Sequence, residues 1–339
     1  MTINKTLGDT LSFKDDIEAE FGGNPARSLG SYRITQSVGE LSNLPLDDGV
    51  PTSGEIKFSD FYGKKLNIVV NCFSTDANNG GTEETRVDAK TDKWNNNKIV
   101  VVGGFSSKKE NGSKIIIHVN KKICSDKVNI NRCALKTGSW PASSTVQVDV
   151  GSSAQLLGSG GNGGTGATGN SAGGAGGDGT SGLGIESNNC TVNVVSGGII
   201  RAGFGGGGGG GGGRQVDKGE DRKSSGGGGG GGQGCPGGNK GAPGGSGNNT
   251  IAASDNATAG DESEAGEGGT ANENAGETIG GSGGEGGSFG EAANQGNNSS
   301  QAGGAGGADG AAIRRVSGYN VTINNNGTIQ GGTNATGVA

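Results

Sequence analysis

The sequence predicts a mainly β protein with little helix, in three parts: a small N-terminal unit (residues 1–66), an antiparallel β-domain (67–157) and a glycine-rich domain (158–339) of extended helices interleaved with short β-units. Two observations support this prediction. Of the 79 glycines, 65 lie in residues 151–339 and only 14 in residues 1–150. Short runs rich in Val and Ile, with the alternation typical of strands, recur between the glycine tracts.

Residues 1–66 combine one helical pattern with one aromatic segment. The stretch Ser12–Phe21 fits a short amphipathic helix, with Ser12 as its N-cap and Gly22 as its end. Further on, polar and apolar residues alternate in Glu55–Gly63, and the segment ends with the aromatic residues Phe58, Phe61 and Tyr62. We therefore expect a separate small unit.

Residues 67–157 alternate in several short runs, which predict strands at 67–72, 98–102, around Ile115 and around Val146. Such alternation is typical of a sheet with one buried face, and we expect antiparallel pairing. Trp94 and Trp140 are the aromatic residues expected to seed the core of this domain.

A strand unit repeats through the second half of the chain. Its copies begin at Thr145–Val150, Thr191–Val195 and Tyr319–Ile323, and each reads strand, Gly- or Asn-containing turn, short strand, glycine tract. The segment 113–130, with a second strand at Lys127–Ile130, resembles an earlier copy. Repeats of this kind predict stacked β-units, as in a solenoid, with the glycine tracts as insertions.

The glycine tracts, including nine glycines at Gly205–Gly213 and seven at Gly226–Gly232, cannot form a side-chain core. They are either a disordered linker or a structure held by backbone alone. Anchoring by strands at both ends favours order. The ordered form that glycine favours is a bundle of left-handed polyproline-II-type helices, bonded backbone to backbone. Residues 214–225, 249–257 and 292–301 would then be loops at the helix tips.

Composition excludes several classes of protein. A net charge of −6 argues against nucleic-acid binding. The longest apolar runs are strand-sized, so no membrane insertion is expected, and residues 1–10 lack the apolar core of a signal peptide. Five cysteines without a CxxC pair predict reduced thiols rather than a disulfide framework.

The residues give no basis for an enzyme, a cofactor or a metal site. His118 is the only histidine and lies in an alternating strand, which leaves no base for a catalytic triad. Matches to GxGxxG are expected by chance at this glycine content. The segment 173–181 is one imperfect copy of a calcium-binding repeat, and the acidic run 261–264 is expected to be a solvated loop.

Two features resemble known proteins. The segment Ser53–Lys64 (SGEIKFSDFYGK) resembles a motif near the N-terminus of tailed-phage structural proteins. The strand units and glycine tracts resemble the glycine-rich tail-fibre adhesins of T-even-like myoviruses, whose C-terminal domain is a polyglycine-II sandwich. The resemblance implies a virion tail protein, assembled in the host cytoplasm, whose N-terminal part attaches to the particle and whose loops bind a bacterial receptor.

On this basis we expect a non-covalent receptor-binding loop with the following residues: Arg214, Gln215, Asp217, Lys218, Asp221, Arg222, Asn256 and Asn294. Phe58, Phe61 and Tyr62 are the expected virion-attachment residues. The expected partners are other tail, baseplate or fibre proteins and a bacterial protein or glycan, and a homotrimer is one assembly we consider. The alternatives are a baseplate or fibre spacer without receptor contact, and a glycine-rich ice-binding or cell-wall protein.

Overall fold

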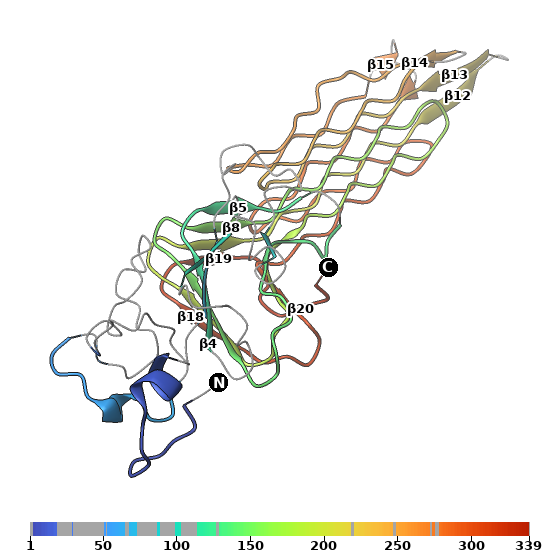
Figure 1. The fold of residues 1–339 in the computed structure, drawn as a ribbon. Coiled ribbons are helices and arrows are strands. Elements are labelled where there is room, and N and C mark those ends of the chain that lie inside the picture. Colours follow the sequence, from blue (N-terminus) through green and yellow to red (C-terminus); the bar gives the residue numbers. More distant parts are fainter. Residues whose placement is uncertain are drawn as a thin grey trace.

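The computed structural model describes the N-terminal unit in part and most of the chain from residue 114 onward. Its described residues are 3–18, 29, 51, 53–64, 68–72, 87–88, 99–102, 114–126, 129–217, 220–246, 249–271, 273–274 and 278–338. Three bodies follow one another along the long axis of the molecule: the N-terminal unit, a β-solenoid and a slab of extended glycine-rich segments (Figure 1). The described part is mainly β with very little helix, as predicted.

The N-terminal unit is held by a small apolar cluster. A single π-helical turn, η1 (Phe13–Glu18), and a 3-10 turn, η4 (Phe58–Phe61), lie in it. Ile3, Ile17 and Phe61 are its buried residues. The predicted longer helix extends into residues 19–22, which lie outside the described part of the chain.

Three sheets form the β-solenoid, whose strands are β1–β11 and β17–β20. The first contains, in spatial order, β18 (Val321–Asn325), β10 (Cys190–Val194), β7 (Thr145–Val150), β4 (Lys114–Val119), β1 (Ile68–Cys72) and β3 (Ile99–Val102). The second contains β19 (Thr328–Gln330), β11 (Ile199–Arg201), β8 (Gln155–Leu157) and β5 (Lys122–Cys124). The third contains β2 (Val87–Asp88), β6 (Cys133–Lys136), β9 (Ser181–Ile185), β17 (Ile313–Arg315) and β20 (Ala335–Thr336).

Strand pairing in the solenoid is parallel, which corrects the expected antiparallel domain. The neighbours of β7, for example, are β4 and β10, and both pairings are parallel. The physical reason is that each coil of chain runs through the three sheets in turn before it returns to the first. Among the described pairs of the three sheets, only β1 and β3 are antiparallel. The second strand of the coil that contains β4 is β5, and residues 127–128 of the expected strand at 127–130 lie outside the described part of the chain.

The repeated strand units predicted from the sequence are confirmed as neighbours. Their apolar positions stack in register through the first sheet, where Ile117 pairs with Val148, Val148 with Val192 and Val192 with Ile323. Trp140 is 7% exposed and belongs to the same core. Trp94 lies outside the described residues.

We expect a large stability loss from Leu156→Ala. Leu156 is fully buried and lies in register between Ile123 and Ile200 in the second sheet. Truncation leaves a cavity inside the coil stack, which typically costs about 2–5 kcal/mol. Urea unfolding should measure this loss, and Thr322→Ala, exposed on β18, should stay within about 0.5 kcal/mol of the wild type. Equal stability of the two variants would contradict a continuous core.

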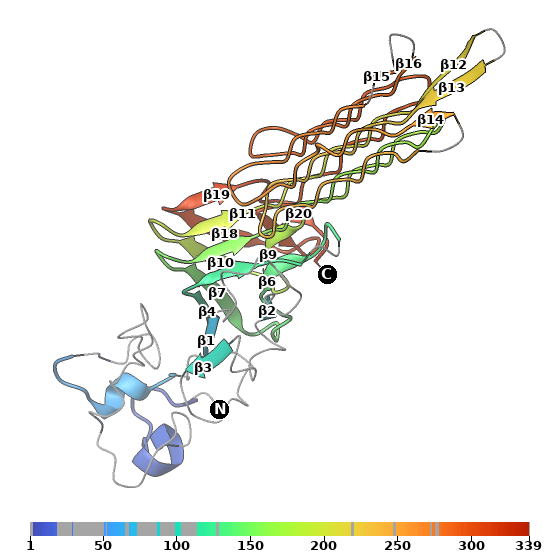
Figure 2. The ribbon, with the colours of Figure 1, turned by 90° about the horizontal axis from the view of Figure 1, so that it is seen from above.

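The glycine slab, defined as residues 158–180 and 202–312, grows out of one corner of the solenoid. In successive coils the second-sheet strand is joined to the third-sheet strand by residues 125–132, 158–180, 202–312 and 331–334. The glycine-rich segments are therefore enlarged corners of two adjacent coils. They run side by side away from the solenoid (Figure 2).

Backbone hydrogen bonds join the segments of the slab and recur at every third residue. The amides of Gly158, Gly161, Gly164 and Ala167 donate in turn to carbonyls along residues 201–210. In a helix with three residues per turn, the amides of every third residue point to the same side of the helix. Extended segments bonded in this way need no side-chain core.

The all-glycine tracts lie at the centre of the slab. The tract 205–212 exchanges backbone hydrogen bonds with six surrounding segments: 158–168, 173–180, 225–234, 280–288, 292–297 and 302–311. The tract 226–232 is likewise surrounded. A Cβ on Gly208 or Gly229 would lie within 3.0 Å of a neighbouring backbone carbonyl. Because each central tract contacts neighbouring backbone on every side, it has no room for side chains, and the tract is therefore all glycine.

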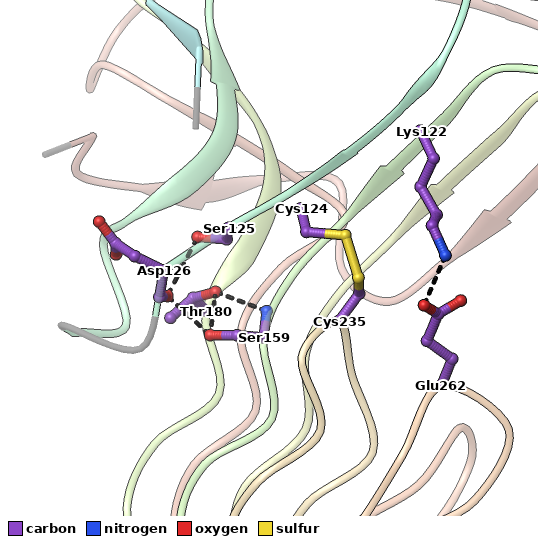
Figure 3. The surroundings of a disulfide bond; sticks show 8 residues. All are labelled: Lys122, Cys124, Ser125, Asp126, Ser159, Thr180, Cys235 and Glu262. Carbon is purple, nitrogen blue, oxygen red and sulfur yellow. Dashed lines mark hydrogen bonds and ion pairs between the residues drawn. A yellow bond between two sulfur atoms is a disulfide. The ribbon is translucent and has the colours of Figure 1, made fainter. Parts of the chain in front are cut away.

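One disulfide ties the slab to the solenoid, which corrects the expectation of reduced thiols. Cys124, at the end of β5, is bonded to Cys235, in a turn of the slab (Figure 3). The two residues are 111 positions apart, so their proximity depends on how the slab packs against β5. Cys190 remains a buried thiol, and burial raises its pKa to about 12.

Candidate functional site

The far end of the slab gathers several turns and two hairpins, which we call the tip. Its strands are β12 (Gly213–Asp217), β13 (Glu220–Ser224), β14 (Thr250–Ile251), β15 (Glu273–Asn274) and β16 (Thr278–Ile279). The turns at 169–172 and 298–301 complete it. The tip lies at the opposite end of the molecule from the N-terminal unit (Figure 1).

Hydrogen bonds between distant parts of the sequence hold the tip together. The Arg214 amide donates to Ser300 Oγ over 2.8 Å, and Ser300 Oγ donates back to the Arg214 carbonyl over 3.1 Å. Gln301 Nε2 donates to Asn170 Oδ1 over 3.1 Å. On the other side β13 pairs in parallel with β14. The hairpin β12–β13 is therefore supported by neighbours from three separate segments.

The hairpin carries an exposed charged network. Arg214 Nε lies 2.9 Å from Asp221 Oδ1, and Lys223 Nζ lies 3.5 Å from Asp221 Oδ2. The hydrogen bond from Arg214 is the main cause that lowers the pKa of Asp221 below its usual value. Because the pKa is lowered in the folded state, this pair supports the hairpin above the ordinary pKa of aspartate and is lost as pH falls through the lowered value.

The register of β12 and β13 places the apolar side chain of Val216 among these charged side chains. In β12–β13, Val216 pairs with Asp221 and Arg214 with Lys223, so these residues share one face of the hairpin. Val216 is 63% exposed. Val216 was not predicted from the sequence, although it is the only apolar side chain among the polar and charged residues of 214–225.

The structure gathers some of the predicted receptor-binding residues and separates others. Arg214, Gln215, Asp221 and Arg222 lie on the tip hairpin, and Asp217 ends β12. Lys218 lies outside the described residues.

Asn256 and Asn294 lie on the flanks of the slab instead. Asn256 Nδ2 donates to Thr270 Oγ1 over 3.0 Å, which links two adjacent segments. The Asn294 amide donates to the Glu285 carbonyl over 2.9 Å. Both side chains are exposed, but neither residue is part of the tip.

The predicted attachment residues have different surroundings. Phe61 is fully buried in the N-terminal cluster. Tyr62 Oη donates to the Asp9 carbonyl over 2.6 Å. Phe58 is 41% exposed and packs edge to face against Phe13, with ring centroids 6.2 Å apart. Of the three aromatic rings, Phe58 is the one that offers an apolar surface to a partner.

Two properties of the described residues bear on other functions. Among them, no cluster of three or more His, Cys, Asp or Glu side chains could hold a metal ion. The helices within the described ranges are all too short or too polar to cross a membrane.

Comparison with protein families identifies the chain. Residues 83–334, which include the slab and the solenoid strands β2–β11 and β17–β19, match the family described as phage tail fibre adhesin Gp38. The chain belongs to this family. It is therefore a bacteriophage tail fibre adhesin, a protein of the virion tail that serves host attachment, and its family is not a class of enzymes. The predicted resemblance to tail-fibre adhesins is confirmed.

One solved structure is similar to the adhesin over much of its length. It is the gp37-gp38 adhesin tip complex of the bacteriophage S16 long tail fiber. The match has 21% sequence identity and a TM-score of 0.37, and it covers 83% of this chain and 88% of the matched chain. A comparison with curated proteins found no match.

Proposed function

We propose that the adhesin binds a bacterial surface receptor non-covalently through its tip, held away from the particle by the glycine slab. The observation that carries this proposal is the placement of an exposed hairpin, with Val216 among charged side chains, at the end farthest from the N-terminal unit (Figure 1). An exposed apolar residue ringed by charged groups is typical of a protein interface.

The slab is proposed to be a polyglycine-II bundle that acts as a rigid spacer. Hydrogen bonds that recur at every third residue, and glycines at which an added Cβ would meet the backbone of a neighbouring segment, support this assignment. The central tracts have no side chains to rearrange, and their amides are bonded within the slab. A spacer of this kind presents the hairpin in one orientation, which lowers the entropy lost on binding.

The N-terminal unit is proposed to attach the adhesin to another tail fibre protein. Exposed Phe58, beside Phe13, provides an apolar contact for such a partner, while Phe61 and Tyr62 hold the unit together. The S16 structure is described as a complex of gp37 with gp38. We propose the corresponding kind of partnership here, with residues 1–66 as the attachment unit. Strands β9–β11 and β17–β20 of the expected glycine-rich domain (158–339) share the solenoid sheets with the expected β-domain (67–157).

Val216→Asp tests the role of the tip. We expect phage particles carrying this variant to adsorb to host cells at least about 30-fold more weakly, the effect of losing an anchor worth about 2 kcal/mol. Val216 is exposed, so folding is expected to be unaffected. Adsorption is measured with particles, and thermal unfolding with purified protein.

Lys240→Ala is the matched control, because Lys240 forms an exposed ion pair with Asp255 on the flank of the slab. It should leave adsorption unchanged. Normal adsorption by particles that carry Val216→Asp and also lack the side chains of Arg214 and Arg222 would overturn the tip assignment and support a spacer.

A further inference from the structure

A polar groove lies at the root of the slab, at the opposite end from the tip. It opens between the outer face of β8, β11 and β19 in the second sheet and the slab turn at 261–264, and its volume is about 660 Å³. This is within the usual range for small-molecule sites, about 300–1,000 Å³. Leu157 and Ile199, which line the groove, pack against the disulfide Cys124–Cys235. Figure 3 shows this disulfide near Lys122 and Glu262.

The floor of the groove comes from outward positions of strands in register. Ile199 pairs with Gln155 on one side and with Thr328 on the other, and Arg201 pairs with Leu157 and Gln330. The floor is therefore apolar at its middle, at Leu157 and Ile199, with amide and hydroxyl groups around it.

The wall of the groove is a turn with a fixed shape. Asp261 Oδ1 accepts hydrogen bonds from the amides of Ser263 and Glu264, over 2.6 and 3.0 Å. The Gly234 amide donates to the Asp261 carbonyl over 2.9 Å. Lys122 Nζ, on β5, lies 2.6 Å from Glu262 Oε1 and links the wall to the solenoid (Figure 3). The groove is thus formed before any ligand arrives.

One hydrogen-bond donor of Arg201, a residue that lines this groove, is left without a partner among the described residues. Its Nε is buried and has no hydrogen-bond partner among the described residues. Burial lowers the pKa of Arg201, and the nearby carboxylates of Glu262 and Asp261 oppose that shift. A buried donor without a partner is costly, so Arg201 gains if a ligand in the groove supplies oxygen acceptors to the part of its guanidinium that lines the groove.

The formal charges around the groove cancel. Arg201 and Lys122 carry positive charges, and Asp261 and Glu262 carry negative ones. A ligand with a strong charge of either sign gains little from such a site. Hydroxyl groups, which both donate and accept, match its mixture of guanidinium, carboxylate and amide groups.

We propose that this groove binds a neutral saccharide. Ring hydroxyls would bond to Arg201, Gln330 and Asp261, and the C–H face of the sugar would lie over Ile199, which packs on buried Leu157. The site is separate from the tip and does not depend on the receptor that the tip binds.

The test titrates the full chain with maltose, lactose and N,N′-diacetylchitobiose by ligand-observed NMR. We expect at least one disaccharide to bind with a Kd on the order of 1 mM. Arg201→Met keeps much of the side-chain volume but removes the donors, and it should weaken binding at least about tenfold. Gln330→Leu, at the half-exposed edge of the floor, should do the same without disturbing the buried wall.

Gln295→Leu is the matched control, because Gln295 is exposed on the flank of the slab. It should leave saccharide binding unchanged, and so should Val216→Asp, which tests the tip alone. Absence of binding for all three disaccharides would overturn the proposal. Binding that survives both groove substitutions, or binding of inorganic phosphate in place of the sugars, would also overturn it.

Discussion

Replacing Gly208 with alanine is expected to disrupt the glycine slab. Gly208 donates to the Asn294 carbonyl and accepts from the Gly284 amide, so its segment is bonded to two neighbouring segments. An added Cβ would meet the backbone carbonyl of Gly304, which cannot rotate away as a flexible side chain could. Overpacking typically costs 1–3 kcal/mol, and we expect about 3 kcal/mol or more because neighbouring segments must separate. Thermal unfolding and protease resistance of residues 202–312 measure the effect.

Gly245→Ala provides the control within the same slab. A Cβ at Gly245 meets nothing within 4 Å, and its backbone does not need glycine. Alanine there should leave stability unchanged or raise it by about 0.4–1 kcal/mol, because the unfolded chain loses freedom. If Gly208→Ala and Gly245→Ala were equally stable, close backbone packing could not be what holds the slab together.

Loss of the Cys124–Cys235 disulfide is the second large effect. The bond closes a loop across 111 residues and joins β5 to a turn of the slab. For a loop of about 100 residues the chain-entropy model gives about 4.7 kcal/mol, and losses of 2–5 kcal/mol are common. We expect the double variant Cys124→Ser with Cys235→Ser to lose about 4 kcal/mol in urea unfolding.

Treating the wild type with a reducing agent distinguishes the effect of losing the disulfide from any effect of the two Ser substitutions. The wild type in reductant should lose about as much stability as the double variant, and the double variant should not respond to reductant. A wild type that unfolds at the same urea concentration with and without reductant would refute a contribution of this bond to stability.

The strand repeat was predictable because buried Val and Ile recur in the same order in each copy. Thr145–Val150, Thr191–Val195 and Tyr319–Ile323 contribute the neighbouring strands β7, β10 and β18. Strand direction was not predictable from these residues, because alternation of inward and outward side chains is the same in parallel and antiparallel strands. The path of each coil decides the direction.

The candidate site was predictable in part. The charged break at 214–225 between two pure glycine tracts marks a point where the chain leaves the slab and returns, and the tip hairpin lies there. Asn256 and Asn294 also interrupt glycine-rich sequence, but they lie along outer segments, where side chains simply point outward. The root groove was not visible in the sequence, because it joins strands 155–157, 199–201 and 328–330 to a turn at 261–264.

The sequence by itself favoured glycine packed as backbone over a disordered linker, and it favoured stacking of the Val- and Ile-rich strands, because no other core is available to residues 151–339. The tertiary structure decided which tracts are central. Tracts 205–212 and 226–232 are surrounded on all sides and admit no Cβ. An outer segment such as 237–246 needs glycine only where it faces inward, as at Gly238, Gly241 and Gly244. Position within the packed slab, rather than local propensity, sets that difference.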